Sequence, residues 1–198
     1  GFAIFDGELG QLPKLVASGT VDLGKSVLDF GPYPHCYRKA AREMVSRIID
    51  ATSSHTNGLL IAHHVVIEEI NSGRDRYVQK LLENIHTAAC ERLESFPITY
   101  LNSDGATGWR THLGLKLTKD QKKANAKLSK AKREAEEDGV KLDKKKVGVR
   151  GKTTKKHLAI EWAKQNYKNT LKVKDNNEAD AICIGAAFFM GAEPCDGT

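Results

Sequence analysis

The sequence predicts an α/β fold, in which helices cover the faces of a β-sheet. Val65–Glu68 is a short run of aliphatic residues that ends in an acid, which is typical of a central strand with both faces buried. Apolar residues recur with helical spacing on either side of it, in His35–Ala51 and in Arg76–Leu93. Strand-forming and helix-forming segments therefore alternate along the chain, and this order favours helices packed on a sheet.

The remaining elements follow from the same patterns. Gly1–Asp6 and Lys14–Leu23 are β-prone and are separated by glycine-containing turns, so they predict a β-hairpin. Glu178–Met190 is apolar and rich in small residues, and it predicts a buried helix. The segments between them predict a strand at Pro97–Leu101, a short helix from Trp109, a polar helix over Lys119–Glu137 and an amphipathic helix over Thr154–Lys168.

Length and composition are those of one domain over residues 1–198, with 40% hydrophobic residues to form a core. No apolar run approaches the roughly 20 residues that span a bilayer, and the first residues lack the basic leader of a secretory signal. The cysteines are widely spaced and form no CxxC pair, which argues against a zinc site and favours a reducing compartment. We therefore expect a cytoplasmic protein.

The net charge of +6 is concentrated in one segment. Residues 116–156 contain 16 basic and 6 acidic residues, a balance of +10, whereas the rest of the chain carries −4. We therefore expect a basic, helical or mobile insertion over 118–152. Such asymmetry favours a polyanionic partner, nucleic acid first. The alternative is a solvated segment that only keeps the protein soluble.

Two acids follow apolar segments that are distant in sequence. Glu68 ends the predicted central strand, and Asp180 falls in the first turn of the buried C-terminal helix. Side chains alternate along a strand, so Glu68 and Glu69 point to opposite faces. Burying a carboxylate in an apolar environment costs free energy unless the carboxylate is paired with a cation or binds a metal. We expect Glu68 and Asp180 to meet and to bind a divalent cation, since hard cations prefer oxygen ligands.

Motifs in a fixed order carry a resemblance to a known family. They are Gly1–Asp6, Leu15–Gly19, Val66–Glu68 and Glu178–Ala181. In this order and spacing they resemble RuvC-type Holliday junction resolvases, the crossover junction endodeoxyribonucleases of the ribonuclease H-like superfamily. Residues between Asn71 and His86, and Thr107–Gly114, also resemble the phage-encoded branch of these enzymes. The resemblance covers most of the chain except about 118–150.

The resemblance implies a ribonuclease H-like mixed sheet flanked by helices. It also implies a homodimer that nicks a four-way DNA junction with two Mg²⁺ ions (Mn²⁺ is the alternative), leaving 5′-phosphate and 3′-hydroxyl ends in recombination and repair. In such enzymes one ion activates water and the other stabilises the leaving oxygen. For a phage-encoded member the compartment is the cytoplasm of the bacterial host. Glu68, Asp180 and Asn177 correspond to catalytic positions, with Glu68 and Asp180 as metal ligands.

Two departures from the family pattern affect the expected site. The family's leading carboxylate lies on a strand before the Gly1–Phe5 segment, so that strand appears absent, unless an alternative alignment makes Asp6 this ligand. The position three before Asp180 is Asn177, which supplies a carbonyl oxygen but no charge. Glu178 or Asp175 could substitute for it. These departures leave two alternatives to a resolvase: a non-catalytic protein that binds branched DNA, and a ribonuclease H-type nuclease acting on hybrids.

Several residues are candidates for DNA contact. Trp109 and Arg110 follow a glycine-containing loop and could stack on a base or bind a phosphate, whereas core packing of Trp109 is the equal alternative. Three lysines near the start of the predicted helix over Thr154–Lys168 are candidate phosphate ligands, because helix starts present N–H groups to phosphate. They are Lys152, Lys155 and Lys156. Arg76 could also reach a phosphate, or it could equally pair with Asp75 or Glu83. The segment Lys119–Lys146 is expected to act as a DNA-binding arm with salt-dependent affinity and no sequence readout.

Overall fold

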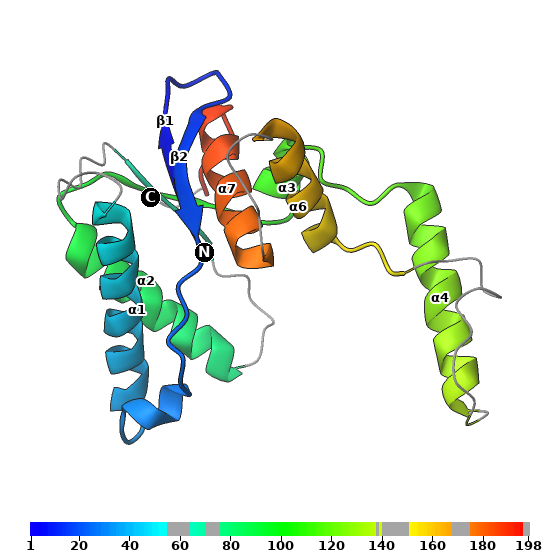
Figure 1. Cartoon of the computed structure of the whole chain (residues 1–198), viewed down its shortest axis with the longest axis horizontal. Helices are drawn as coiled ribbons and strands as arrows, with labels where there is room; N and C mark the ends of the chain where they lie inside the picture. Colours follow the sequence, from blue (N-terminus) through cyan, green and yellow to red (C-terminus); the bar gives the residue numbers. More distant parts are fainter. Residues whose placement is uncertain (55–63, 70–75, 138, 140–150, 168–174, 196–198) are drawn as a thin grey trace.

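The computed structural model describes residues 1–54, 64–69, 76–137, 139, 151–167 and 175–195, and it is a mixed α/β structure (Figure 1). The strands and the helices alternate as the sequence predicts over its first half, and helices follow in its second half. The elements are β1 (Phe2–Asp6), β2 (Lys14–Gly19), the 3₁₀ helix η1 (Val27–Phe30), α1 (His35–Ser53), β3 (Val65–Glu68), α2 (Arg76–Leu93), β4 (Ile98–Leu101), α3 (Trp109–His112), α4 (Lys119–Glu137), α6 (Lys155–Asn166) and α7 (Asn176–Phe189).

The strands form two separate pairs. Strands β1 and β2 are antiparallel, with Phe2 opposite Gly19 and Asp6 opposite Lys14, so the predicted hairpin is confirmed. Strands β3 and β4 are parallel, and α2 makes the crossover that a parallel pair needs. Within the described residues no backbone ladder joins the antiparallel pair to the parallel pair, so the single mixed sheet that the resemblance implies is not shown.

Helix α7 holds the two strand pairs together. It contacts β1, β2 and β3, and its buried residues Ile182, Cys183 and Ala187 belong to the main core with Leu101 and Trp109. This burial follows from a helix that is apolar on most sides. Consequently the first turns of α7 lie close to the carboxyl end of β3, where Glu68 is found.

A close approach between α7 and β1 depends on one glycine. A Cβ atom added at Gly185 would clash with the ring of Phe5. That ring cannot easily move away, because it packs against Tyr167 and Phe189 with ring centroids 6.1 and 6.2 Å apart. Glycine at this position lets the helix lie directly on the hairpin.

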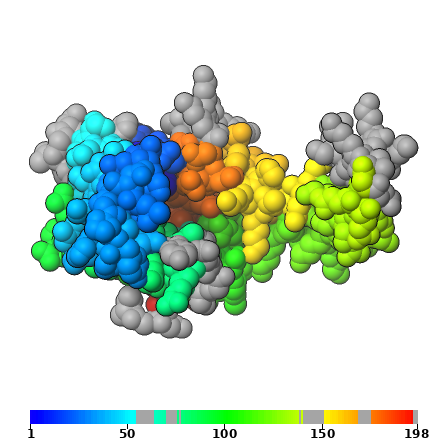
Figure 2. Space-filling model, turned by 90° about the horizontal axis from the view of Figure 1, so that it is seen from below, coloured from blue at the N-terminus to red at the C-terminus, as the bar shows by residue number. Residues whose placement is uncertain are grey.

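Helices α1 and α2 pack on each other around a second cluster of buried residues. Helix α4 differs from both, because it is polar almost throughout and has one buried residue, Asn125. Figures 1 and 2 show α4 standing out from the rest of the described structure, to the right in both views. Residues 138 and 140–150 of the expected basic insertion lie outside the described residues. Among the described helices, none has the length and apolarity needed to cross a membrane.

Candidate metal centre

Glu68 is placed by the parallel strand pair. It lies opposite Leu101 in the ladder, and the next residue, Glu69, donates its backbone N–H to the Leu101 carbonyl over 2.9 Å. The alternation of strand side chains separates the two acids, as predicted. Burial lowers the pKa of His86, and the negative charge of Glu69 opposes that shift. Glu68 forms an ion pair with Arg110, which places this acid in the candidate site.

Asp180 is placed by the start of α7. Asp175 caps the helix, and its Oδ1 accepts the backbone N–H of Glu178 over 2.9 Å. Asp180 follows in the second turn, between the buried residues Ala179 and Ile182, and its side chain is 17% exposed. Its carboxylate is therefore partly desolvated, as expected for an acid at the edge of a buried helix.

Arg110 lies between the two acids. Its guanidinium donates to Asp180 Oδ2 over 3.1 Å and lies 3.5 Å from Glu68 Oε1. These distances and the width of a guanidinium put the two carboxylate oxygens within about 9 Å of each other. Two acids more than a hundred positions apart in sequence thus converge on one cationic group. The sequence predicts that they meet, but around a divalent metal ion instead of a guanidinium.

The loop after β4 explains how Arg110 reaches the acids. Gly108 lies so close to the backbone of Asp104 that a side chain at this position would clash with it. Trp109 donates its backbone N–H to the carbonyl of Asn102 over 2.8 Å, and its indole is fully buried in the main core. The Arg110 guanidinium lies 4.1 Å from the Trp109 ring centroid, which gives a cation–π contact. The guanidinium of Arg110 thus lies over the buried indole ring and pairs with the two acids through its terminal nitrogens.

Electrostatics at the site are dominated by partial burial. Burial raises the pKa of Asp180, and the positive charges of Arg110 and Lys156 act in the opposite direction. Asp180 Oδ1 is buried and makes no hydrogen bond with any described residue. The pKa of the Gly1 amino group is lowered by burial, although Asp175, Asp180, Glu178 and Glu68 all favour its charged form. The start of α7 and the end of β3 therefore create a region of negative potential.

The donor set fits one hard cation. Mg²⁺ in proteins is often held by one or two carboxylates, with water and substrate phosphates completing its shell. The buried Oδ1 of Asp180 is an oxygen with a free lone pair, and Glu68 supplies the second carboxylate. Within the described ranges no three His, Cys, Asp or Glu side chains gather closely enough to form a metal site by themselves. A cation here would also compete with Arg110 for both acids.

The other predicted ligands do not join the two acids. Asn177 is exposed, and it has no hydrogen bond to Glu68 or Asp180 within the described structure. Glu178 is buried and accepts a hydrogen bond from Ser18 Oγ over 2.7 Å, which ties α7 to β2. Asp6 is exposed at the far end of β1, about 17 Å along the strand from Gly1. Because Gly1 is the end of β1 that lies near the acids, the alignment that makes Asp6 a ligand is not supported.

Trp109 and Arg110, the candidates for DNA contact in the loop region after β4, are both largely buried. Trp109 has no exposed surface, so it packs in the core and cannot stack on a DNA base in this arrangement. Arg110 is 12% exposed and has two acidic partners, so it is not a free phosphate ligand. Core packing of Trp109 was the equal alternative to DNA contact in the sequence. The ion pairs of Arg110 had no local sequence signal, because both acidic partners come from distant elements.

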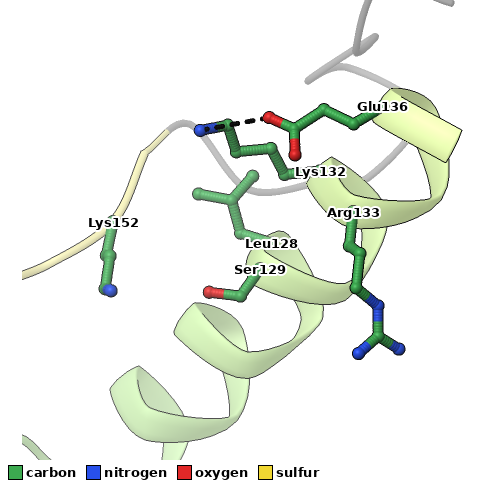
Figure 3. Close-up of a pocket in the computed structure, with 6 residues that line it drawn as sticks. All are labelled: Leu128, Ser129, Lys132, Arg133, Glu136 and Lys152. Carbon is green, nitrogen blue, oxygen red and sulfur yellow. Dashed lines mark ion pairs between the residues drawn. The ribbon is translucent and has the colours of Figure 1, made fainter. Parts of the chain in front are cut away.

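The basic candidates differ in how they relate to the acidic site. Lys156 is exposed and close enough for its charge to act on Asp180. Lys155 Nζ lies 2.5 Å from Asp104 Oδ1, so it links α6 to the loop that carries Trp109. Arg76 is exposed at the first residue of α2. Lys152 lies across a hollow of about 360 Å³ from Leu128 and Ser129 of α4 (Figure 3).

This hollow is not a second acidic site. Its lining also includes Lys132, Arg133 and Glu136, and the carboxylate of Glu136 pairs with Lys132 at 3.5 Å (Figure 3). The hollow belongs to α4 and the segment before α6, whereas Glu68 and Asp180 lie on β3 and α7. The hollow lined by basic residues and the pair of acids are thus on different elements.

Comparisons with protein-family models, with curated proteins and with solved structures return no match.

Proposed function

We propose that this protein is a Mg²⁺-dependent endonuclease with a ribonuclease H-like fold that cuts branched DNA, in the manner of a RuvC-type resolvase. The observation that carries the proposal is the convergence of Glu68 and Asp180 on one cationic group in a partly closed site. The order of elements, the parallel β3–β4 pair and the acid-bearing start of α7 support the proposed fold.

The proposed roles follow from the chemistry of each side chain. Glu68 and Asp180 supply oxygen ligands for Mg²⁺, and Lys156 supplies positive charge that attracts a DNA phosphate toward Asp180. Bound Mg²⁺ would offset the negative charge that develops during phosphodiester hydrolysis and help to activate water. Arg110 holds the two carboxylates together and offsets one of their two negative charges when no other cation is bound. A homodimer would present two such sites to symmetric strands of a junction.

A synthetic four-way junction tests this proposal. We expect nicking that requires Mg²⁺ and leaves 5′-phosphates, and we expect Glu68→Gln and Asp180→Asn to reduce its rate by at least about a hundredfold. Glu69→Gln is the matched control, because this neighbouring acid follows Glu68 on the opposite face of the strand and its charge acts on His86. The control should cut as fast as the unmodified protein. Equal cutting by all four proteins would remove the two acids from the mechanism.

The alternative without catalysis has one observation in its favour. Arg110 already partners both acids, so the site is an ion triad that could serve structure alone. Tight junction binding with no Mg²⁺-dependent nicking would support that alternative. Faster cleavage of an RNA–DNA hybrid than of a junction would instead indicate a ribonuclease H-type enzyme. Both results come from the same assay with labelled substrates.

A further inference from the structure

Helix α4 carries two groups of basic residues that differ in their partners. In its C-terminal part each basic residue pairs with an acid four positions later, at 3.5–3.7 Å. These pairs are Lys130–Glu134, Lys132–Glu136 and Arg133–Glu137. In its N-terminal part the basic residues are exposed and form no ion pair with any residue that the structure describes. They are Lys119, Lys122, Lys123 and Lys127, which we call the lysine stripe.

The lysine stripe faces away from the rest of the molecule. Residues three or four apart are neighbours on a helix surface, so the four lysines share one side of α4. The other side is held by Asn125, the buried residue of this helix. Its side chain donates to the Thr153 carbonyl over 2.7 Å and accepts the Thr153 backbone N–H over 2.9 Å. The four lysines are exposed, and α4 stands out from the rest of the described structure (Figures 1 and 2), so the stripe suits contact with a large partner.

The chemistry of the stripe points to phosphate recognition along a duplex. Lysines four residues apart are separated by a rise of about 6 Å, which is close to two steps, about 7 Å, along one DNA strand. Helix α4 contains no aromatic residue on which an unpaired base could stack. Asn125, a side chain that could read base edges, is already bound to Thr153. These features favour a duplex backbone over single strands and over sequence-specific contact.

We infer that the lysine stripe is a second DNA-binding site, which holds the phosphates of a duplex arm away from the acidic site. The inference rests on the proposed function for the identity of its partner. The N-terminal half of α4 would then bind DNA, whereas the basic residues of its C-terminal half are already paired with Glu134, Glu136 and Glu137. Binding there is expected to be strongly salt-dependent, because each neutralised phosphate releases condensed counterions.

The test compares two triple variants that lose the same charge. Lys119→Gln/Lys123→Gln/Lys127→Gln removes three stripe lysines, while Lys14→Gln/Lys39→Gln/Lys164→Gln removes three exposed lysines of the body. Binding of a labelled junction with long duplex arms is measured by fluorescence anisotropy over a range of salt concentrations. Circular dichroism checks helicity, which glutamine should preserve.

We expect the stripe variant to lower the slope of log affinity against log salt by about 2 to 3, at roughly 0.9 per phosphate contact. The body variant should change the slope by less than about 1. Equal slopes for the two variants would overturn the inference, and so would tighter binding to duplex RNA than to duplex DNA. Nicking of the same junction is recorded in parallel. A slope that falls without nicking would contradict the nuclease proposal alone, and nicking with an unchanged slope would contradict the stripe alone.

Discussion

The guanidinium of Arg110 donates a 3.1 Å hydrogen bond to Asp180, across 70 positions of sequence. The same guanidinium lies 3.5 Å from Glu68, and it rests on the buried ring of Trp109. One residue of α3 therefore joins β3, α7 and the core. Arg110 offsets one of the two negative charges of the acids that we propose as metal ligands, so it stabilises the site and would compete with a metal ion for it.

Replacing Arg110 should separate these two effects. Arg110→Gln leaves two partly buried acids without their cationic partner, so we expect a loss of about 1–3 kcal/mol in the free energy of unfolding in buffer with EDTA. Thermal unfolding measures this loss. Isothermal titration with Mg²⁺ should show binding tightened by about tenfold or more, because a competing charge has been removed.

Arg42→Gln is the control for this prediction. Arg42 pairs with Glu91 at 3.6 Å, but both side chains are about half exposed or more. Exposed ion pairs contribute roughly 0–1 kcal/mol, so stability should change little and Mg²⁺ affinity not at all. If Arg110→Gln behaved like Arg42→Gln in both measurements, Arg110 would have neither role.

Trp109 should act on stability rather than on DNA contact. Its indole is fully buried, so Trp109→Ala is expected to cost about 3–5 kcal/mol in the free energy of unfolding. Trp109→Phe keeps an aromatic ring in the core and should cost less. Chemical denaturation measures both losses, and DNA affinity of the folded Trp109→Phe variant should stay within about twofold of the unmodified protein. Lost affinity with unchanged stability would mean that the indole contacts DNA after all.

Gly185 should be intolerant of even one methyl group. Alanine is the better helix former by about 1 kcal/mol, yet its Cβ would clash with the Phe5 ring, and overpacking costs about 1–3 kcal/mol. We expect Gly185→Ala to lower the melting temperature. At Gly151 an added Cβ would meet no heavy atom within 4 Å, so Gly151→Ala should have little effect. A stabilised Gly185→Ala variant would show that α7 and β1 are not in close contact.

His86 should make stability depend on pH. Burial lowers the pKa of His86 below its ordinary value near 6.5. The unfolded chain then binds the proton more tightly, so the stabilisation is fully present above about pH 6.5 and is lost as pH falls through the lowered pKa. Urea denaturation between about pH 5 and 8, the range in which histidine titrates, should show this decline. His86→Gln should flatten it, and an unchanged profile would assign the decline to other groups.

The sequence predicted the elements whose patterns are local. Val65–Glu68 was identified by its continuous apolar run, and the hairpin by glycine turns between two β-prone segments. The meeting of Glu68 and Asp180 could also be predicted, because Glu68 ends an apolar strand and Asp180 lies near the start of a buried helix. Local patterns and fold-level rules together were sufficient for these features.

Other features depend on the path of the chain through space. The ion pairs of Arg110 require the turn that Gly108 makes against Asp104, which no periodicity reveals. The separation of the strands into two pairs depends on backbone ladders between distant segments. The total charge of the basic segment does not reveal that the two halves of α4 differ in ion pairing. The structure shows this difference, because Lys130, Lys132 and Arg133 each pair with an acid.

The central claim is that Glu68 and Asp180 share a bound cation. Anomalous diffraction from crystals soaked in Mn²⁺ tests this most directly, since the ion reports its own position. The account predicts a peak within about 2.0–2.6 Å of oxygens from both carboxylates, with the Arg110 guanidinium displaced from at least one of them. A saturating soak that leaves both acids paired with Arg110 and shows no peak between them would contradict it.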